Sequence, residues 1–314
     1  MRRLLVAACL ALALCGSVFA AGYPEKEIRL IVPFAAGGGT DAVARAVADI
    51  ASKDIGQNIV IMNKTGGAGA VGMAEGARSR PDGYTVTMIT RELCSLFQMD
   101  LSPVQPKDFE PICLVNEDPA VVLVPKNSPY KTIKDLVDDA KARPGSIKYA
   151  SAAQPNIYLL AMMTELNLDF NQIPYGGAAE AVPALLGGHC DFTIIGPGEG
   201  IAQIRAGELI PLAVCSEKRF AGLPDVPTMG ESGYNVIAST WRGLAVPLRT
   251  PKEIKDKLEA SFRKAIESPE FEKFMADRHL GIRFIPSDQY MDFMVKDVAA
   301  LAPITEIIKA QQGK

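Results

Sequence analysis

Glycine-rich or small-residue segments before three expected helices are the best candidates for chemistry in this chain, and the chemistry they suit is anion binding. Residues 34–40 include three successive glycines, residues 151–156 follow an expected strand, and residues 176–177 open a third helix. The first turn of a helix leaves backbone N–H groups unpaired at the positive end of the helix dipole. Such an end binds carboxylate or phosphate without a cationic side chain. Each segment alone could be an ordinary turn, but together they predict an anion site.

Motifs of known enzymes occur only as fragments. Residues 67–72 read G-x-G-x-x-G, but residues 63–66 separate them from the preceding strand, and the next strand ends in Thr90-Arg91 rather than an acid. A tight turn is therefore favoured over a dinucleotide site. Residues 128–131 and 64–66 match penicillin-binding motifs in reversed order, so we interpret both as coincidence.

The histidines and cysteines give little support to a metal site or a nucleophile. The chain has two histidines, and neither has an evident serine or cysteine partner for a triad. Beyond residue 20 the cysteines contain no C-x-x-C pair, and buried free thiols are favoured over disulfides. We therefore expect no catalytic residue, no metal site and no cofactor. The cysteines concerned are Cys94, Cys113, Cys190 and Cys215.

Short strands alternate with helices, and these elements must position the three segments. Residues 28–33 are an expected strand, which leads into a helix that is capped by Thr40 and Asp41 and ends near Lys53. This alternation predicts parallel sheets covered by helices on both faces. Ligands of such sheets bind beyond the carboxyl ends of the strands. Further strands are expected over residues 58–62, 84–90, 147–150, 191–195 and 209–215.

Two helix starts carry local capping signals. Thr132 with Asp135 predicts a capping box. Thr250, Pro251 and Glu253 supply a cap, a first-turn proline and an acid for a later helix.

A length of 314 residues fits two domains, and turn signals suggest where the chain crosses between them. The apolar run 121–124 breaks at Pro125, and the prolines and glycine of residues 224–230 mark a return. Two crossings predict α/β lobes with a ligand cleft between them and permit hinge closure. We expect one lobe from residues 22–123 plus 230–314, and the other from residues 124–229.

The first residues differ from the rest of the chain. Residues 1–3 are basic, residues 4–14 are apolar, and residues 18–20 offer small side chains for cleavage near Ala20. This pattern predicts a signal peptide over residues 1–20 and an exported, periplasmic protein, with an uncleaved anchor as the alternative. The net charge of −3 does not suggest a nucleic-acid partner.

An ordered set of motifs extends over nearly the whole chain beyond residue 20. It comprises Tyr23-Pro24, residues 31–38 with Thr40, Asp41 and Arg45, Asn63-Lys64, residues 66–69, 81–85, 131–136, 174–177 and 186–188, Asp191, residues 223–228 and 231–233, Trp241, Gly243, Leu244 and Pro247. Together these segments resemble the periplasmic solute receptors of tripartite tricarboxylate transporters, the Bug family.

The resemblance implies a type II periplasmic-binding-protein fold, with two α/β lobes joined by two crossover segments. It also implies a non-catalytic, monomeric receptor that captures a small organic acid and delivers it to the permease subunits of a tripartite membrane transporter. The acid would be a dicarboxylate, a tricarboxylate or an aromatic acid. A receptor that reports its ligand to a membrane sensor is the nearest alternative, and an exported α/β enzyme is the competing class.

By the same resemblance, one carboxylate sits on the loop 34–40 and on the helix starts at Ser151 and Gly176. Arg91 follows an expected strand, where its planar fork could hold a second acidic group, unless it is solvated or paired with Glu92. The chain departs from the family at Gly176, where a basic residue is common, and within residues 152–159 and 195–197. The candidate ligand-binding residues are Phe34, Ala35, Gly37, Gly38, Thr40, Asp41, Arg91, Ser151, Gln154, Asn156, Tyr175, Gly176, Gly177 and Pro197.

Overall fold

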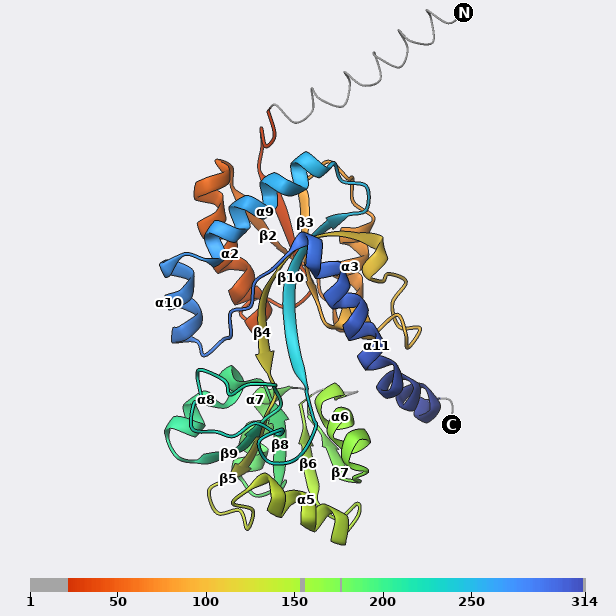
Figure 1. Cartoon of the computed structure of the whole chain (residues 1–314), viewed down its shortest axis with the longest axis vertical. Coiled ribbons are helices and arrows are strands. Elements are labelled where there is room, and N and C mark those ends of the chain that lie inside the picture. Colours follow the sequence, from red (N-terminus) through yellow and green to blue (C-terminus); the bar gives the residue numbers. More distant parts are fainter. Residues whose placement is uncertain (1–21, 153–155, 176, 313–314) are drawn as a thin grey trace, which may run out of the picture. The chain divides into compact units, whose positions relative to one another are not determined.

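The computed structural model of this chain describes residues 22–152, 156–175 and 177–312, which form two compact units (Figure 1). Unit 1 contains the residues up to Val115, Arg242–Glu272 and Phe284–Val298. Unit 2 contains Asn116–Trp241, Lys273–Arg283 and the residues from Ala299 onward. Among the helices of these described residues, none is long and apolar enough to cross a membrane.

Unit 1 is built on a mixed sheet with the strand order β11-β4-β10-β3-β1-β2. β1 lies between β2 and β3 and is parallel to both, whereas β10 is antiparallel to β3. Every residue of β3 is buried, as expected for a central strand covered on both faces. The strands are β1 (Ile28–Val32), β2 (Ile59–Asn63), β3 (Thr85–Thr90), β4 (Phe109–Pro119), β10 (Ser239–Pro247) and β11 (Ile285–Pro286).

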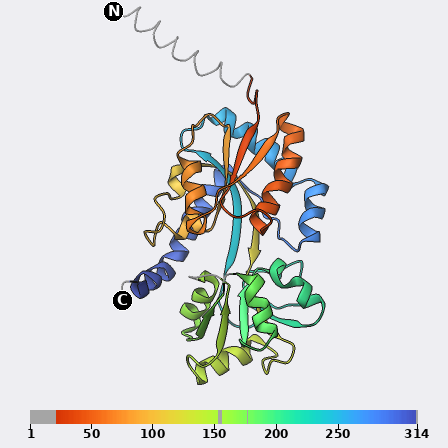
Figure 2. The ribbon, with the colours of Figure 1, turned by 180° about the vertical axis from the view of Figure 1, so that it is seen from behind.

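The helices that link the parallel strands of unit 1 cover both faces of its sheet. Because such connections are right-handed, α2 between β1 and β2 and α3 between β2 and β3 lie on opposite faces of the sheet. α9 packs against α2 (Figure 2). Because β1 and β3 are neighbouring parallel strands, the turns that follow them lie side by side at one edge of the sheet. The helices are α2 (Gly39–Ile55), α3 (Ala70–Ala77), α4 (Glu92–Ser95), α9 (Lys252–Ile266), α10 (Pro269–Asp277) and α11 (Ser287–Gln312), with short 3₁₀ turns η1 (Gly67–Gly69) and η2 (Pro106–Asp108).

The G-x-G-x-x-G segment is a packing feature of unit 1. A Cβ atom on Gly72 would lie 2.6 Å from the carbonyl oxygen of Lys64 and 2.9 Å from the Cα of Pro33. Glycine at this position therefore permits close approach of α3 to the neighbouring backbone. This agrees with the turn favoured from the sequence.

Unit 2 repeats the arrangement on a smaller sheet with the order β7-β6-β8-β5-β9. β6 is parallel to β7 and β8, and β5 is antiparallel to β8 and β9. One cluster of its core consists of aliphatic and aromatic side chains contributed by the strands, α7 and residues 220–226. The elements are β5 (Val121–Pro125), α5 (Ile133–Ala142), β6 (Lys148–Ser151), α6 (Ile157–Leu166), β7 (Asn171–Pro174), α7 (Ala178–Leu186), β8 (Phe192–Ile195), α8 (Pro197–Arg205) and β9 (Leu209–Val214).

The unit boundaries differ from the lobes expected from the sequence. The chain changes unit after Val115, within β4, and after Trp241, within β10, rather than at residues 124 and 230. The apolar run 121–124 pairs with β8 and β9, so it belongs to the unit 2 sheet. Residues 273–283 and those from 299 onward also group with unit 2. The expected crossings lie at the end of β5 and in the segment between β9 and β10, whereas the unit boundaries fall inside β4 and β10.

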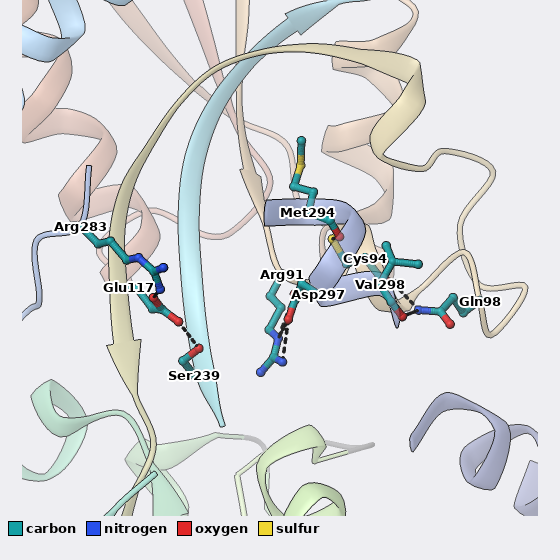
Figure 3. Close-up of polar contacts among 9 residues, drawn as sticks. All are labelled: Arg91, Cys94, Gln98, Glu117, Ser239, Arg283, Met294, Asp297 and Val298. Carbon is teal, nitrogen blue, oxygen red and sulfur yellow. Dashed lines mark hydrogen bonds and ion pairs between the residues drawn. The ribbon is translucent and has the colours of Figure 1, made fainter. Parts of the chain in front are cut away.

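Polar contacts within unit 2 link the segments next to these boundaries. Glu117 accepts hydrogen bonds from Ser239 and Arg283 (Figure 3). The main-chain N–H of Gly281 donates to Asp118 Oδ1 at 2.7 Å. Three stretches that are distant in sequence are thereby joined.

Of the helix starts expected from the sequence, one is present as expected and two have a different N-cap residue. The Thr132–Asp135 capping box is present, with Thr132 Oγ1 accepting from Asp135 N and Asp135 Oδ2 accepting from Thr132 N. α2, however, begins after Gly38 with no side-chain cap, and Thr40 and Asp41 lie inside its first turn. The N-cap of α9 is Pro251 rather than Thr250. All four cysteines beyond residue 20 are buried free thiols.

Candidate functional site

The loop between β1 and α2 is held in shape by the Asp41 side chain. Gly37 has a φ of +85°, a conformation that favours glycine, and its N–H donates to Asp41 Oδ2 at 2.9 Å. Arg45 Nε donates to the same oxygen, also at 2.9 Å. Asn63 Nδ2, at the end of β2, donates to Asp41 Oδ1 and to the carbonyl of Phe34. The N–H of Gly37 is therefore used within the loop.

The charged carboxylate of Asp41 is paired with groups of the protein itself. Burial alone would raise its pKa, but hydrogen bonds from Arg45, Gly37 and Asn63 outweigh burial and lower the pKa to about 2. Its carboxylate oxygens accept three hydrogen bonds from the protein. Asp41 thus supports the loop, and Arg45 compensates its charge near the helix N-terminus.

The N-terminus of α2 offers main-chain donors. The N-cap residue Gly38 provides no side-chain acceptor, and no described residue accepts a hydrogen bond from the N–H of Gly39, Thr40 or Asp41. These three groups lie at the positive end of a 17-residue helix. Gly38 has an extended backbone (φ −76°, ψ 170°), and a Cβ there would meet only the carbonyl oxygen of Ala35 at 3.5 Å, so a side chain at this position would fit the loop.

Arg242 brings a cation to the same helix end. Its Nε donates to Thr40 Oγ1 at 3.0 Å, and a Cβ on Gly39 would lie 3.4 Å from its Nη2. The position follows from strand pairing, because Arg242 in β10 stands opposite Thr90 in β3. Arg242 and Asn63 are not among the site residues expected from the sequence. Only the positions of Asn63 at a strand end and of Arg242 beside the motif residue Trp241 could have drawn attention to them.

Arg91 lies directly after β3 and pairs with α11. Its Nη2 is 2.8 Å from Asp297 Oδ1, and its Nε donates to both oxygens of the same carboxylate at 3.1 Å (Figure 3). Both side chains are largely buried, with 11% and 12% of their surface exposed. Glu92, the partner considered from the sequence, accepts from Thr90 Oγ1 instead.

The corresponding residues of unit 2 follow β6 and β7. Asn156 is buried, and its side chain caps α6 by accepting from Leu159 N at 3.0 Å. Ser151 is also buried, and its carbonyl accepts from Tyr175 N at 2.9 Å. Gln154 and Gly176 lie outside the described residues.

The remaining helix starts of unit 2 contrast with each other. α7 begins after Gly177, which supplies no side-chain cap, whereas the hydroxyl of Tyr175 points to Cys190 Sγ at 3.6 Å. At α8, Gly196 N–H donates to Glu199 at 2.8 Å, and Pro197 at the first position has no N–H to offer. An anion at α8 would meet the Glu199 carboxylate.

The expected residues thus fall into two groups. The loop 34–41 and Arg91 follow neighbouring strands of unit 1, and Ser151, Asn156, Tyr175 and Gly177 follow neighbouring strands of unit 2. In the described part of the chain, no cluster of three or more histidine, cysteine, aspartate or glutamate side chains could hold a metal ion. The geometry suits reversible anion binding through main-chain amides and arginine.

Comparison with known proteins identifies the class of molecule. The family described as "Tripartite tricarboxylate transporter family receptor" (TctC) matches residues 43–310. The chain belongs to this receptor family. BugT of Bordetella pertussis is 31% identical over 291 residues, which cover 90% of this chain and 89% of BugT.

Solved structures of TctC and related proteins share the fold. A TctC solute-binding protein from Polaromonas has a TM-score of 0.81 and 32% identity, with 90% of this chain and 99% of that chain covered. An adipate-bound protein from R. palustris has a TM-score of 0.79 and 25% identity, with coverage of 90% and 97%. The expected fold class, Bug-type family and receptor function are confirmed, and TctC receptors are periplasmic solute-binding proteins rather than enzymes.

Proposed function

We propose that this TctC receptor binds a small dicarboxylate and that the N-terminus of α2 holds one of its carboxylates. The observation that carries the proposal is the set of three N–H groups, at Gly39, Thr40 and Asp41, that no described residue accepts. Unpaired amides at a helix N-terminus suit an anion. Adipate in the R. palustris relative supports the ligand class.

A second cationic group favours a diacid over a monoacid. Arg242 is anchored on Thr40 beside the helix end, whereas the Nε and Nη2 of Arg91 are engaged by Asp297. Arginine offers several donors in a planar fork that suits a carboxylate, and Arg242 stands beside the uncapped helix end. We therefore assign the stronger ligand contact to Arg242 and a weaker or indirect one to Arg91.

Ligand identity is tested by a thermal-shift screen followed by calorimetry on the purified protein. The panel contains mono-, di- and tricarboxylates, aromatic acids and the matching uncharged amides. We expect dicarboxylates to raise the melting temperature and bind one per chain, and to be recovered unchanged. Binding of the amides as tightly as the acids, or no binding by any acid, would contradict the proposal.

We further propose that residues 1–20 direct export and that the receptor delivers its ligand to the permease subunits of a tripartite transporter, as a monomer. Residues 1–21 lie outside the described part of the chain. Mass spectrometry of the protein from the periplasmic fraction should give a mature chain that begins near Ala21. Recovery of the full-length chain in the membrane fraction would contradict cleavage.

A further inference from the structure

A cationic hollow lies in unit 1 where β1 and β3 begin. Its volume is about 480 Å³, within the range of small-molecule sites. The whole chain has a net charge of −3, yet the charged side chains of this lining are mostly positive. These are the cations Lys26, Arg29, Arg78 and Arg80 and the acids Glu27 and Asp82.

Two of the cations are oriented by the protein. Arg29 stands opposite Thr85 in the parallel pairing of β1 with β3, and its Nη2 donates to Thr85 Oγ1 at 2.9 Å. Lys26 Nζ lies 4.5 Å from the centre of the Tyr84 ring. Arg78 and Arg80 follow α3 on the segment that leads into β3.

The positive charges of the hollow are only partly compensated, since four cations and two acids line it. Among the described residues, none of the four cations forms an ion pair within 4.0 Å, and Asp82 accepts from the main-chain N–H of Tyr84. Exposed cations elsewhere in the chain, such as Lys53 and Arg219, do have carboxylate partners. Like charges gathered around one hollow repel each other, and a bound anion would relieve that repulsion.

This hollow is separate from the α2 site. Arg29 stands near the beginning of β1, whereas Phe34 to Gly38 follow its carboxyl end. A strand of this length spans about 17 Å, so one small ligand at the N-terminus of α2 cannot also occupy the hollow.

We propose that the cationic hollow is a second anion site, for a small molecule with two or more closely spaced phosphate or carboxylate groups. Arginine binds such groups through paired hydrogen bonds. Several arginines around one hollow therefore favour a ligand with several negative charges over a ligand with one. Because the side chains are exposed, binding weakens as salt screens the charges.

The test is a calorimetric titration of the purified receptor with pyrophosphate at low and at high salt. We expect one pyrophosphate bound per hollow, with about tenfold or greater weakening in the Arg78→Gln/Arg80→Gln double variant. The matched control is Lys107→Gln/Lys141→Gln, which removes the same charge from exposed positions outside the lining and should bind as the wild type does. Circular dichroism checks folding, and Lys26→Gln/Arg78→Gln replaces the first variant if that variant does not fold.

The Gly38→Val variant separates this site from the α2 site. It should leave pyrophosphate binding unchanged even if it abolishes dicarboxylate binding. No binding by the wild type, equal weakening in the hollow and control variants, or loss of pyrophosphate binding in Gly38→Val would overturn the proposal. The hollow variants should retain dicarboxylate affinity, so failure of this site leaves the proposed receptor function standing.

Discussion

Units 1 and 2 repeat one β-α-β-α-β motif but begin their first helices differently. In unit 1 the strands β2-β1-β3 are followed in the sheet by antiparallel β10, and in unit 2 β7-β6-β8 are followed by antiparallel β5. α2 begins after Gly38 without a side-chain cap, whereas Asn156 caps α6. A cap and a bound anion use the same N–H groups. The shared topology creates equivalent helix ends, and single residues decide which of them remain available.

The turns after the third parallel strands differ in charge. Arg91 follows β3 in unit 1, whereas Glu199 stands in the first turn of α8, which follows β8 in unit 2. Asp297 compensates Arg91, and Glu199 accepts from Gly196 N–H. In unit 2 the α7 start at Gly177 differs from α6 in having no side-chain cap, although Glu180 stands in its first turn.

The largest expected effect comes from covering the α2 amides. In Gly38→Val, the branched side chain stands where an N-cap side chain reaches the second and third N–H groups. We expect dicarboxylate affinity to fall by about 100-fold or more, since each hydrogen bond to a charged group contributes roughly 1.5–3 kcal/mol. Gly177→Val, the matching change at the uncapped start of α7 in unit 2, should weaken binding less, because the proposal places the carboxylate at α2.

Calorimetry with the tightest acid from the screen measures both variants. Gly196→Ala at α8 is the control and should bind as the wild type does, since Glu199 already accepts from this turn. A larger loss of dicarboxylate affinity in Gly177→Val than in Gly38→Val would contradict the assignment of the carboxylate to α2.

Substitution of Arg242 and of Arg91 in unit 1 should separate effects on binding from effects on stability. Arg242→Gln should weaken dicarboxylate binding by about 10- to 100-fold, as expected for loss of a paired contact to a charged group. Arg91→Gln should have a smaller effect on affinity but should lower the melting temperature, because it leaves the buried Asp297 carboxylate without its cation.

A diacid and its monoacid analogue are titrated against both arginine variants. The Arg242 variant should lose affinity for the diacid more than for the monoacid. If the Arg91 variant instead shows this selective loss of affinity for the diacid with an unchanged melting temperature, then Arg91 binds the second acidic group.

The Asp41 network predicts a pH dependence specific to unit 1. The pKa of Asp41 is lowered from 3.8 to about 2, so its stabilising effect is present above pH 3.8 and is lost as the pH falls through about 2. The loss amounts to about 2 kcal/mol of the free energy of unfolding. Urea unfolding between pH 2 and pH 6 should show this decrease in the wild type and a smaller one in Asp41→Asn. Asp49→Asn, an exposed position on the same helix, serves as control; equal slopes for Asp41→Asn and wild type would refute the network's role.

The smallest expected effect concerns the capped helix of unit 2. Asn156→Ala removes the acceptor for Leu159 N–H and should lower the free energy of unfolding by about 1 kcal/mol. Dicarboxylate affinity should change by less than about twofold, which corresponds to under 0.5 kcal/mol. A loss comparable to that of Gly38→Val would mean that Asn156 itself contacts the ligand.

Local signals in the sequence were sufficient for many elements. The Thr132–Asp135 capping box and the strands at residues 28–33 and 84–90 depend on residues a few positions apart, and the structure contains them with small shifts. β4 and β10 were not anticipated, because proline and charged or polar residues interrupt their apolar pattern. As a result the predicted crossings were placed at the end of β5 and in the segment between β9 and β10.

The sequence by itself determined the family motifs, the α/β alternation and the glycine-rich start of α2, since each depends on neighbouring residues. Only the tertiary structure decided which charges surround that start. Asn63 reaches Asp41 because β2 lies beside β1, Arg242 reaches Thr40 because β10 pairs with β3, and Asp297 pairs with Arg91 across 206 residues of sequence. Strand order and helix packing create such contacts, and no spacing of residue types along the chain encodes them locally.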